Sequence, residues 1–309
     1  MTAVTTLQHL DSRLADAVRG LAEDAADTDG VSALSEASRL ALDPGGPSGT
    51  AHLLAREDGA LVGYAQVWPD RSAELVVSPG HRRQGVGTAL WGGAAGAGAV
   101  RVWAHGDLPA ARAFAESGGL TAVRSLLRMG RPLSDADRDP RPLPEGYAVT
   151  TYADRAPAVD DPVRELQELN ATAFAGHPEQ GRLTVADLRA RMDESWFDPE
   201  GMLYVMDPTD PGRGPVAFHW TKIEDGDVDT PVAGEVYVVG VHPDHRGRGL
   251  AGPLTDLGLA HLAARGCRKV VLYVDGDNAP ARATYERAGL SVESTDRVYA
   301  RDDSDDADG

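Results

Sequence analysis

Two short glycine-rich segments of this 309-residue chain have the residue types that bind phosphate groups. One extends from Arg246 to Gly252 and the other from Arg82 to Thr88, and each follows an apolar stretch and precedes a predicted helix. Glycines before a helix expose backbone N–H groups, and the helix dipole and nearby arginines add positive charge. Both segments therefore predict a site for a phosphate or pyrophosphate group.

The second segment also contains G-x-G-x-x-G, from Gly247 to Gly252, which is the fingerprint of dinucleotide-binding proteins. Five residues separate the preceding apolar run from Gly247, whereas the turn in that class of protein is tight. The first segment has Arg83 and Thr88 at the two matching positions. The segments share only R-x-x-G-x-[GA], so the sequence argues against a nicotinamide enzyme.

The two segments belong to an internal repeat. Residues 74–90 align without a gap with residues 238–254, and residues 105–120 align with residues 275–290. Each copy has the pattern of an apolar strand, a loop, a helix, a second strand and a second helix. The repeat predicts two related α/β domains, each a mixed β-sheet flanked by helices.

Composition places the boundaries between these domains. Residues 131–146 combine four prolines with alternating charges, which is typical of a linker. Residues 301–309 form an acidic tail. We therefore expect an N-terminal domain over residues 1–130 and a C-terminal domain over residues 147–300.

The second copy contains two segments with sequence signals for the start or the end of a helix. The segment 250–266 has leucines near helical spacing, with Pro253 in its first turn and Gly266 at its end. The segment 279–288 begins after Asn278, a residue that can cap a helix. Both segments are predicted to be helices.

One carboxylate interrupts the apolar strand before the second loop. Glu235 lies in GEVYVVGV, where a charge needs a partner or a function, so it is a candidate site residue. His242 and His245 have a metal-like spacing, but they flank a proline and no cysteine or carboxylate cluster joins them, so no metal is expected. Cys267, the single cysteine, is predicted to be a small core residue.

Charge and hydropathy limit the classes of function. The formal net charge of −18 argues against nucleic-acid binding, because no basic face is expected. The N-terminal residues lack the basic start and apolar core of a signal peptide, and no uncharged stretch has the length of a membrane span. We expect a cytoplasmic monomer with neither a membrane nor a nucleic-acid partner.

The repeated pattern closely resembles the GNAT acetyltransferase superfamily, because Asn278 follows the second strand and Tyr285 comes seven residues later. In that family a bulge splays the strand before the loop, and acetyl-CoA binds along the strand and the loop. The resemblance therefore implies acetyl-CoA as co-substrate. The cofactor residues it implies in the first copy are Leu75, Val76, Val77, Arg83, Gln84, Gly85, Val86, Gly87 and Thr88. Those in the second copy are Val239, Gly240, Val241, Arg246, Gly247, Arg248, Gly249, Leu250, Ala251, Gly252, Asn278, Ala279, Pro280, Ala281, Arg282 and Ala283.

The two copies differ where chemistry would occur. The resemblance implies that Tyr285 protonates the departing CoA thiolate and that Glu235 is the base. At the matching positions the first copy has Ala115 and, in the ungapped alignment, Arg71. We therefore expect the C-terminal domain to be catalytic and the N-terminal domain to be degenerate, binding acetyl-CoA or serving as a scaffold.

Further segments resemble GNAT enzymes that acetylate the cysteinyl amine of an amine-bearing sugar–inositol acceptor. These segments are FAGHPEQG, ESWFDPEG, HWTK and GEVYVVGVHP. The resemblance implies acceptor contacts at Glu36, Glu179, Lys222, Glu235 and Tyr273. Such a set fits the chemistry, since carboxylates hold an ammonium group while lysine and tyrosine bond to sugar hydroxyls.

Two other functions stay open from the sequence. One is acetylation of a different small amine, such as an aminoglycoside or a polyamine. The other is a non-catalytic acetyl-CoA sensor that uses both loops. The presence of Glu235, Asn278 and Tyr285 in the second copy favours an enzyme over a sensor.

Overall fold

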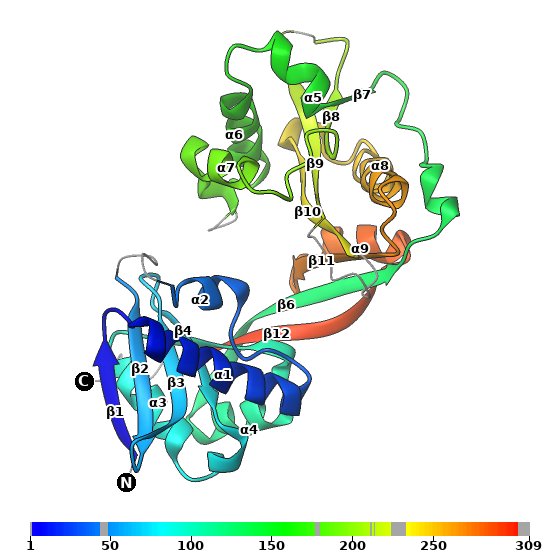
Figure 1. Cartoon of the computed structure of the whole chain (residues 1–309). Helices are drawn as coiled ribbons and strands as arrows, with labels where there is room; N and C mark the ends of the chain where they lie inside the picture. Colours follow the sequence, from blue (N-terminus) through cyan, green and yellow to red (C-terminus); the bar gives the residue numbers. More distant parts are fainter. Residues whose placement is uncertain are drawn as a thin grey trace, which may run out of the picture. The chain divides into compact units, whose positions relative to one another are not determined.

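The computed structural model describes residues 2–43, 49–176, 180–210, 212, 214–223 and 233–301, without the side chain of Glu36. The chain forms two compact units, which Figure 1 shows in the colours of the sequence. Unit 1 comprises residues 1–127 and 294–309, and unit 2 comprises residues 128–293.

Unit 1 contains the elements up to α4 and most of the strands β6 and β12, whose residues 128–132 and 291–293 belong to unit 2. They are β1 (Ala3–Leu7), α1 (Ser12–Asp29), α2 (Glu36–Leu40), β2 (Ala51–Glu57), β3 (Ala60–Val67), β4 (Ser72–Val77), α3 (Val86–Gly96), β5 (Arg101–Ala104), α4 (Pro109–Ser117), β6 (Leu120–Pro132) and β12 (Ser291–Arg301). The strand order is β1-β2-β3-β4-β5-β12-β6, and β4 and β5 run parallel. The sheet is therefore mixed.

Helices cover both faces of the unit 1 sheet (Figure 1). On one face, Val18 of α1 belongs to a core cluster with Leu54 and Tyr64. On the other, Leu90 of α3 packs with Leu53, since successive residues of a strand point to opposite faces. The sheet thus has an apolar layer on each side.

Unit 2 repeats this architecture. Its further elements are β7 (Ala148–Thr151), α5 (Tyr152–Arg155), α6 (Pro162–Ala173), α7 (Val185–Met192), β8 (Met202–Met206), β9 (Pro215–Ile223), β10 (Ala233–Val241), α8 (Ala251–Ala264), β11 (Lys269–Asp275) and α9 (Ala279–Arg287). The strand order is β6-β11-β10-β9-β8-β7, with β10 and β11 parallel. Helices α6 and α7 pack on one face, around Trp220, and α8 packs on the other (Figure 1).

Both helices predicted in the second copy are present. Helix α8 has Pro253 in its first turn, and Gly266 follows its end with a φ of +87°. Helix α9 begins after Asn278, whose side-chain oxygen accepts a hydrogen bond from the backbone N–H of Ala281 at 3.2 Å. These local signals were sufficient because proline, glycine and asparagine act on the backbone directly.

The C-terminal strand departs from the expected domain boundaries. Residues Arg297 to Ala300 of β12 pair with β5, so the end of the chain completes the sheet of unit 1. Asp107, a buried carboxylate, accepts hydrogen bonds from Arg297 Nε and Tyr299 Oη, both at 2.7 Å. The boundary at residue 300 overlooked this pairing, because the repeat carries no information about which sheet a strand joins.

A second polar contact fixes β12 in unit 1. His105 Nδ1 lies 3.1 Å from the Asp296 carboxylate, and its Nε2 lies 3.4 Å from the buried carboxylate of Glu74. Burial alone would lower the pKa of His105, but the two carboxylates outweigh burial and raise the pKa to about 9. The imidazole is therefore protonated at neutral pH and links β12 to β4.

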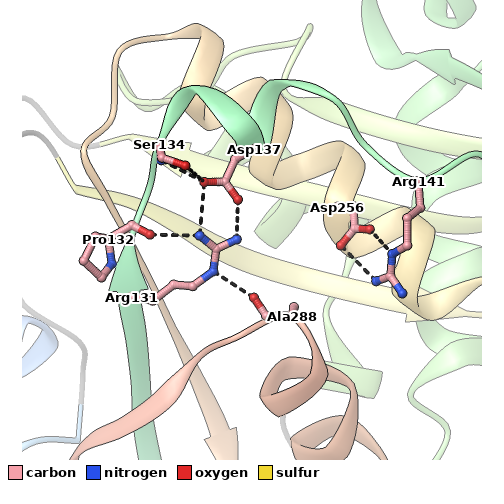
Figure 2. Close-up of polar contacts among 7 residues, drawn as sticks. All are labelled: Arg131, Pro132, Ser134, Asp137, Arg141, Asp256 and Ala288. Carbon is pink, nitrogen blue, oxygen red and sulfur yellow. Dashed lines mark hydrogen bonds and ion pairs between the residues drawn. The ribbon is translucent and has the colours of Figure 1, made fainter.

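The segment expected to be a linker is packed within unit 2, as Figure 2 shows. Arg131, near the end of β6, donates to the Asp137 carboxylate and, at 2.8 Å, to the carbonyl oxygen of Ala288. Arg141 forms a two-bond ion pair with Asp256 of α8. Strand β6 continues through residue 132, and residues 135–138 form a 3₁₀ turn. Proline content alone could not reveal these charge pairs.

Deleting residues 294–309 is expected to unfold unit 1. The deletion removes the partner of β5 and leaves the buried Asp107 carboxylate without Arg297 and Tyr299. Breaking a buried ion pair costs up to about 3–5 kcal/mol, against a typical domain stability of about 5–15 kcal/mol. Although Arg112 Nε still donates to Asp107 at 3.0 Å, the loss of β12 adds to this cost. Thermal unfolding and limited proteolysis measure the effect.

A chain that ends at Arg301 is the control for this deletion, because it keeps every residue of β12. It should resist protease as the full chain does. A protease-resistant fragment of residues 1–127 in the shorter variant would contradict the expected role of β12.

Candidate active site

The two glycine-rich loops share one backbone conformation. Gly247 and Arg83 occupy matching positions with φ values of +74° and +61°. Two residues later, Gly249 and Gly85 have φ values of +79° and +87°. The left-handed region favours glycine, so Arg83 is held there at a cost in strain. Both loops therefore have the same backbone turn before the helix that follows, and this turn suits the exposure of backbone N–H groups to a ligand.

The arginine common to both loops makes hydrogen bonds that position each loop. Arg246 Nε donates to the Val241 carbonyl oxygen at 3.3 Å, and its Nη2 donates to the Ala173 carbonyl oxygen of α6. Arg82 Nε donates to the Val77 carbonyl oxygen at 3.2 Å, and its two terminal nitrogens pair with Asp29 of α1. Each arginine thus ties the end of a strand to the helix that covers it.

The remaining loop residues predicted to contact cofactor divide by burial. Leu250 and Val86, at matching positions, are buried, so only their backbone is available to a ligand. Arg248 is exposed, and its Nη1 donates to the Tyr147 hydroxyl at 3.3 Å. Arg248 is therefore an exposed arginine of the second loop that lies beside the loop amides.

The parallel strands separate beside both loops. Pairing between β10 and β11 ends at Val236 with Leu272, and pairing between β4 and β5 ends at Ala73 with Val102. Among the described residues, nothing extends either register, so residues 239–241 and 75–77 each have one open edge. An open strand edge can pair with an extended ligand as another strand would.

A β-bulge distinguishes the second copy. The register between β9 and β10 shifts between Val236 and Val238, which leaves Tyr237 as the extra residue. The register between β3 and β4 has no such shift. Glu235 pairs with Val271 of β11 in unit 2. In unit 1, Arg101 is the residue that the repeat matches with Val271, and its strand partner is Ser72.

The bulge corrects the ungapped alignment. Ser72, rather than Arg71, holds the place of Glu235 in unit 1. The functional conclusion is unchanged, since neither residue is a carboxylate. In sequence the bulge would appear only as a one-residue change of offset, from 163 at Ser72 and Glu235 to 164 from residues 74 and 238 onward.

Three predicted acceptor residues lie on one face of the unit 2 sheet. Lys222 of β9 and Glu235 of β10 are direct cross-strand partners, so their side chains project from the same face. Tyr273 lies two residues beyond Val271, the parallel partner of Glu235, and is 49% exposed. The alternation of strand residues places Tyr273 on that face as well.

The side chains of the other two predicted acceptor residues, Glu36 and Glu179, lie outside the described part of the structure. Glu36 is the first residue of α2 in unit 1, and its side chain is not described. Glu179 lies outside the described residues.

Tyr285 of α9 is the candidate proton donor. Its side chain is partly buried, and burial raises the pKa of the phenol to about 12. Among the described residues, no hydrogen-bond partner of its hydroxyl is present. A neutral phenol without a structural hydrogen-bond partner has a proton that it can donate. The matching residue Ala115 of α4 has no such group.

Asn278 and Arg282 organise the turn before α9. The Asn278 oxygen is used in the helix cap, and Arg282 Nη1 donates to the Gly276 carbonyl oxygen at 3.0 Å. The remaining predicted cofactor residues here, Ala279, Pro280, Ala281 and Ala283, have short apolar side chains in the first turns of α9. Cofactor contacts by this segment would therefore rest on its backbone and on Asn278.

The repeat could not reveal residues that reach the second loop from outside it. The Tyr147 hydroxyl is within 3.0 Å of His245 Nδ1, and Pro144 lies 3.8 Å from a Cβ built on Gly249. A Cβ built on Gly252 would be 3.3 Å from Arg141 Nη2. The segment before β7 thus lies against the loop and the first turn of α8.

Unit 1 contains a cavity of about 450 Å³ at its own loop. The lining includes Leu75, Val77, Arg83, Gly85 and Gly87, which are all predicted cofactor residues. Ala115, the residue in place of Tyr285, also lines it. The geometry for binding a ligand is therefore present in unit 1 without a phenol.

The described residues contain neither a metal-binding cluster nor a membrane-spanning helix. No group of three or more His, Cys, Asp or Glu side chains among them could hold a metal ion. No helix formed by them is long and apolar enough to cross a membrane. Cys267 is buried, and burial raises the pKa of its thiol.

Comparison with known proteins defines the class. The family model described as acetyltransferase (GNAT) family matches residues 19–118 and 163–290, one region in each copy of the repeat. The chain belongs to the GNAT acetyltransferase family, as two tandem GNAT domains, and is an N-acetyltransferase.

Within that family the similarity is to one group of enzymes. Relatives from Geodermatophilus obscurus and Nocardia farcinica, both named mycothiol acetyltransferase, are each 44% identical to this chain. The alignments cover 96% and 95% of this chain and 97% and 96% of the relatives. By this near full-length similarity the chain groups with the mycothiol acetyltransferases.

Solved structures show the same fold. A GCN5-related N-acetyltransferase from Sphaerobacter thermophilus has a TM-score of 0.69 at 23% identity, over 96% of this chain and 94% of that one. A tandem GNAT protein from the clavulanic acid biosynthesis pathway has a TM-score of 0.67 at 18% identity, over 97% and 98% of the two chains. At these identities the likeness concerns the fold alone.

Proposed function

We propose that this chain transfers the acetyl group of acetyl-CoA to the cysteinyl amine of cysteinyl-glucosaminyl-inositol, which completes mycothiol. The observation that carries the proposal is the 42–44% identity, over nearly the full length, to relatives named mycothiol acetyltransferase. The pairing of Lys222 with Glu235 on one sheet face supports it, because the acceptor combines an ammonium group with many hydroxyls.

The first step is capture and deprotonation of the amine. An α-amino group has a pKa of about 7.7–8.0, so a substantial fraction is already neutral near pH 7.5. Glu235 attracts the ammonium form and accepts the proton that the nitrogen must lose, directly or through a water molecule. Lys222 and Tyr273 bond to the hydroxyls of the sugar and inositol.

The second step is acyl transfer. The amine nitrogen attacks the thioester carbonyl carbon, and a backbone N–H on the open edge of residues 239–241 stabilises the oxyanion. The carbon–sulfur bond then breaks, and the Tyr285 hydroxyl gives its proton to the CoA sulfur. Apolar surroundings keep the phenol neutral, and they also disfavour the anionic CoA thiolate that must take up the proton. The burial that retains the proton on Tyr285 therefore also favours protonation of the sulfur.

Unit 1 binds acetyl-CoA without transferring its acetyl group. The loop conformation at Arg83 and Gly85 and the adjoining cavity support binding. Ser72 and Ala115, at the positions of Glu235 and Tyr285, can supply neither the base nor the acid. Equilibrium binding with the full chain should therefore give two sites for acetyl-CoA per chain and one site of turnover.

The experiment that tests the proposal is steady-state acetylation of the cysteinyl pseudodisaccharide beside an aminoglycoside and a polyamine. We expect the highest kcat/KM with the cysteinyl acceptor. Rapid turnover of another amine without turnover of this one would favour the alternative acceptor. Tight binding of acetyl-CoA without turnover of any amine would favour a sensor.

Replacing Glu235 by glutamine is expected to lower kcat and raise the acceptor KM together, because one side chain serves both tasks. A positioned base typically contributes about 10²–10⁴-fold in rate. Raising the pH above 8 should restore part of the lost kcat, since more of the amine is then neutral. Steady-state kinetics between pH 6.5 and 9 measure both effects.

Glu200→Gln is the matched control, since Glu200 is an exposed glutamate of the same unit. Its kinetics should stay unchanged. A Glu235→Gln enzyme with normal acceptor KM and a pH profile parallel to that of the unaltered enzyme would remove Glu235 from both roles.

A further inference from the structure

The wall that α4 contributes to the unit 1 cavity is apolar. Leu108, just before the helix, and Ala111 and Ala115 within it are three and four residues apart, which places them on one face. All three line the cavity, and so does Phe114, the neighbour of Ala115. The side chains of these four residues offer a ligand carbon atoms and no hydrogen-bonding group.

Unit 2 has polar residues at three of these four positions. The repeat matches Leu108 with Asn278, Phe114 with Thr284 and Ala115 with Tyr285. Each of the three unit 1 residues is therefore apolar where unit 2 has a hydrogen-bonding side chain. Alanine at position 115 also lacks the phenol ring, so it opens space at the place where the proposed mechanism puts the CoA sulfur.

Other walls of the cavity are apolar as well. Leu75 and Val77 of β4 line it, together with Val31 and Ala33 from the segment that follows α1. A Cβ built on Gly106 would lie 3.0 Å from Val31 Cγ1, so the turn before α4 packs against that segment. The volume of about 450 Å³ is within the usual range of small-molecule sites, about 300–1,000 Å³.

Two polar side chains that line the same cavity are engaged with protein partners. Tyr299 Oη donates to the buried Asp107 carboxylate at 2.7 Å. His105 Nδ1 lies 3.1 Å from the Asp296 carboxylate. An apolar ligand group beside these side chains therefore costs none of the bonds that they already make.

We infer that the unit 1 cavity is a site for CoA thioesters whose acyl group is longer than acetyl, with the acyl chain in the apolar space beside Ala115. The inference rests on the proposed binding of acetyl-CoA by unit 1 and adds the class of thioester that this unit prefers. The glycine-rich loop holds the pyrophosphate, and the carbons beyond acetyl leave water for apolar side chains. In unit 2 the Tyr285 phenol fills the matching space, so the catalytic unit keeps its preference for acetyl.

The test is calorimetric titration of the full chain carrying Gly249→Asp, which leaves unit 1 as the cofactor site, with acetyl-CoA, butyryl-CoA and hexanoyl-CoA. Burial of each methylene strengthens binding about fourfold, so butyryl-CoA should bind roughly 15-fold more tightly than acetyl-CoA. Adding Gly85→Asp to the same chain should abolish the heat of binding, which assigns the site to unit 1.

Ala115→Tyr tests the position of the acyl chain. It restores the residue that unit 2 has at the matching position, so it should remove the advantage of butyryl-CoA and leave the affinity for acetyl-CoA nearly unchanged. Because Ala115 is only 2% exposed, Ala115→Val provides a milder change with a smaller loss, and melting temperatures show whether each variant folds. Glu116→Gln, at an exposed residue of the same turn, is the matched control and should bind each thioester as the unaltered unit does.

Equal affinity for acetyl-CoA and butyryl-CoA would overturn the inference while leaving the proposed binding of acetyl-CoA in place. A parallel loss of both thioesters in a folded Ala115→Tyr variant would also overturn it, because the space would then serve the CoA arm rather than the acyl chain. If unit 1 bound none of the thioesters, the inference and the proposed cofactor site would both fail. The titration contains no acceptor, so its result is independent of which amine unit 2 acetylates.

Discussion

Replacing Tyr285 by phenylalanine is expected to lower kcat by about 10²–10⁴-fold, the usual contribution of one positioned proton donor. Phenylalanine keeps the ring, so binding of acetyl-CoA should hardly change. The hydroxyl has no hydrogen-bond partner among the described residues, and its pKa is raised to about 12 by burial. Removing the hydroxyl therefore removes a proton donor without breaking a hydrogen bond that supports the fold. Single-turnover kinetics and direct cofactor binding measure the two quantities.

Tyr152→Phe is the matched control for this change. Tyr152 is another partly buried tyrosine of unit 2, whose pKa is also raised by burial, but it packs against Phe197 and Tyr204. Loss of the Tyr152 hydroxyl should leave kcat unaltered. Near-normal turnover by Tyr285→Phe, with chemistry shown to be rate-limiting, would refute the acid role.

Replacing Gly249 by aspartate is expected to abolish acetyl transfer. A side chain at this residue is strained, since its φ is +79°, and a carboxylate would repel a pyrophosphate held by the loop amides. The strain of about 1–2 kcal/mol for a left-handed L-residue destabilises the loop, and the added negative charge weakens acetyl-CoA binding to unit 2. Equilibrium binding and steady-state rates measure the outcome.

Gly85→Asp makes the same change at the matching position of unit 1, where φ is +87°. It should remove one of the two cofactor sites while most of the activity remains. If Gly85→Asp instead stopped transfer in a fully folded protein and Gly249→Asp did not, unit 1 would be the catalytic half.

Much of the fold could be predicted because local signals and the repeat agree. Apolar periodicity and glycine positions predict the strand, loop, helix, strand and helix of each copy, and the structure contains all of them. The comparisons confirm the tandem GNAT fold. The roles of individual site residues stay predictions, since they depend on ligands that the sequence can only imply.

What the sequence could not reveal depends on pairing between distant residues. The bulge at Tyr237 appears only when β9 is placed beside β10. The rings of Trp196 and Tyr237 meet Lys222 only when the segment after α7 is placed beside β9 and β10. Arg131 likewise donates to the Ala288 carbonyl oxygen 157 positions away, and Arg141 pairs with Asp256 115 positions away.

The position of β12 in unit 1 has a consequence for biosynthesis. A ribosome releases residues 1–127 long before residues 294–301 exist, and domains otherwise fold as they emerge. Until the last strand arrives, the β5 edge is unpaired and Asp107 lacks two of its partners. The nascent N-terminal half must therefore remain incompletely folded, with an exposed strand edge, while the whole catalytic half is synthesised. Contacts between residues nearly 200 positions apart also predict slow closure of this sheet. Chaperone dependence during synthesis should accordingly belong to the N-terminal half, although the C-terminal half performs the chemistry.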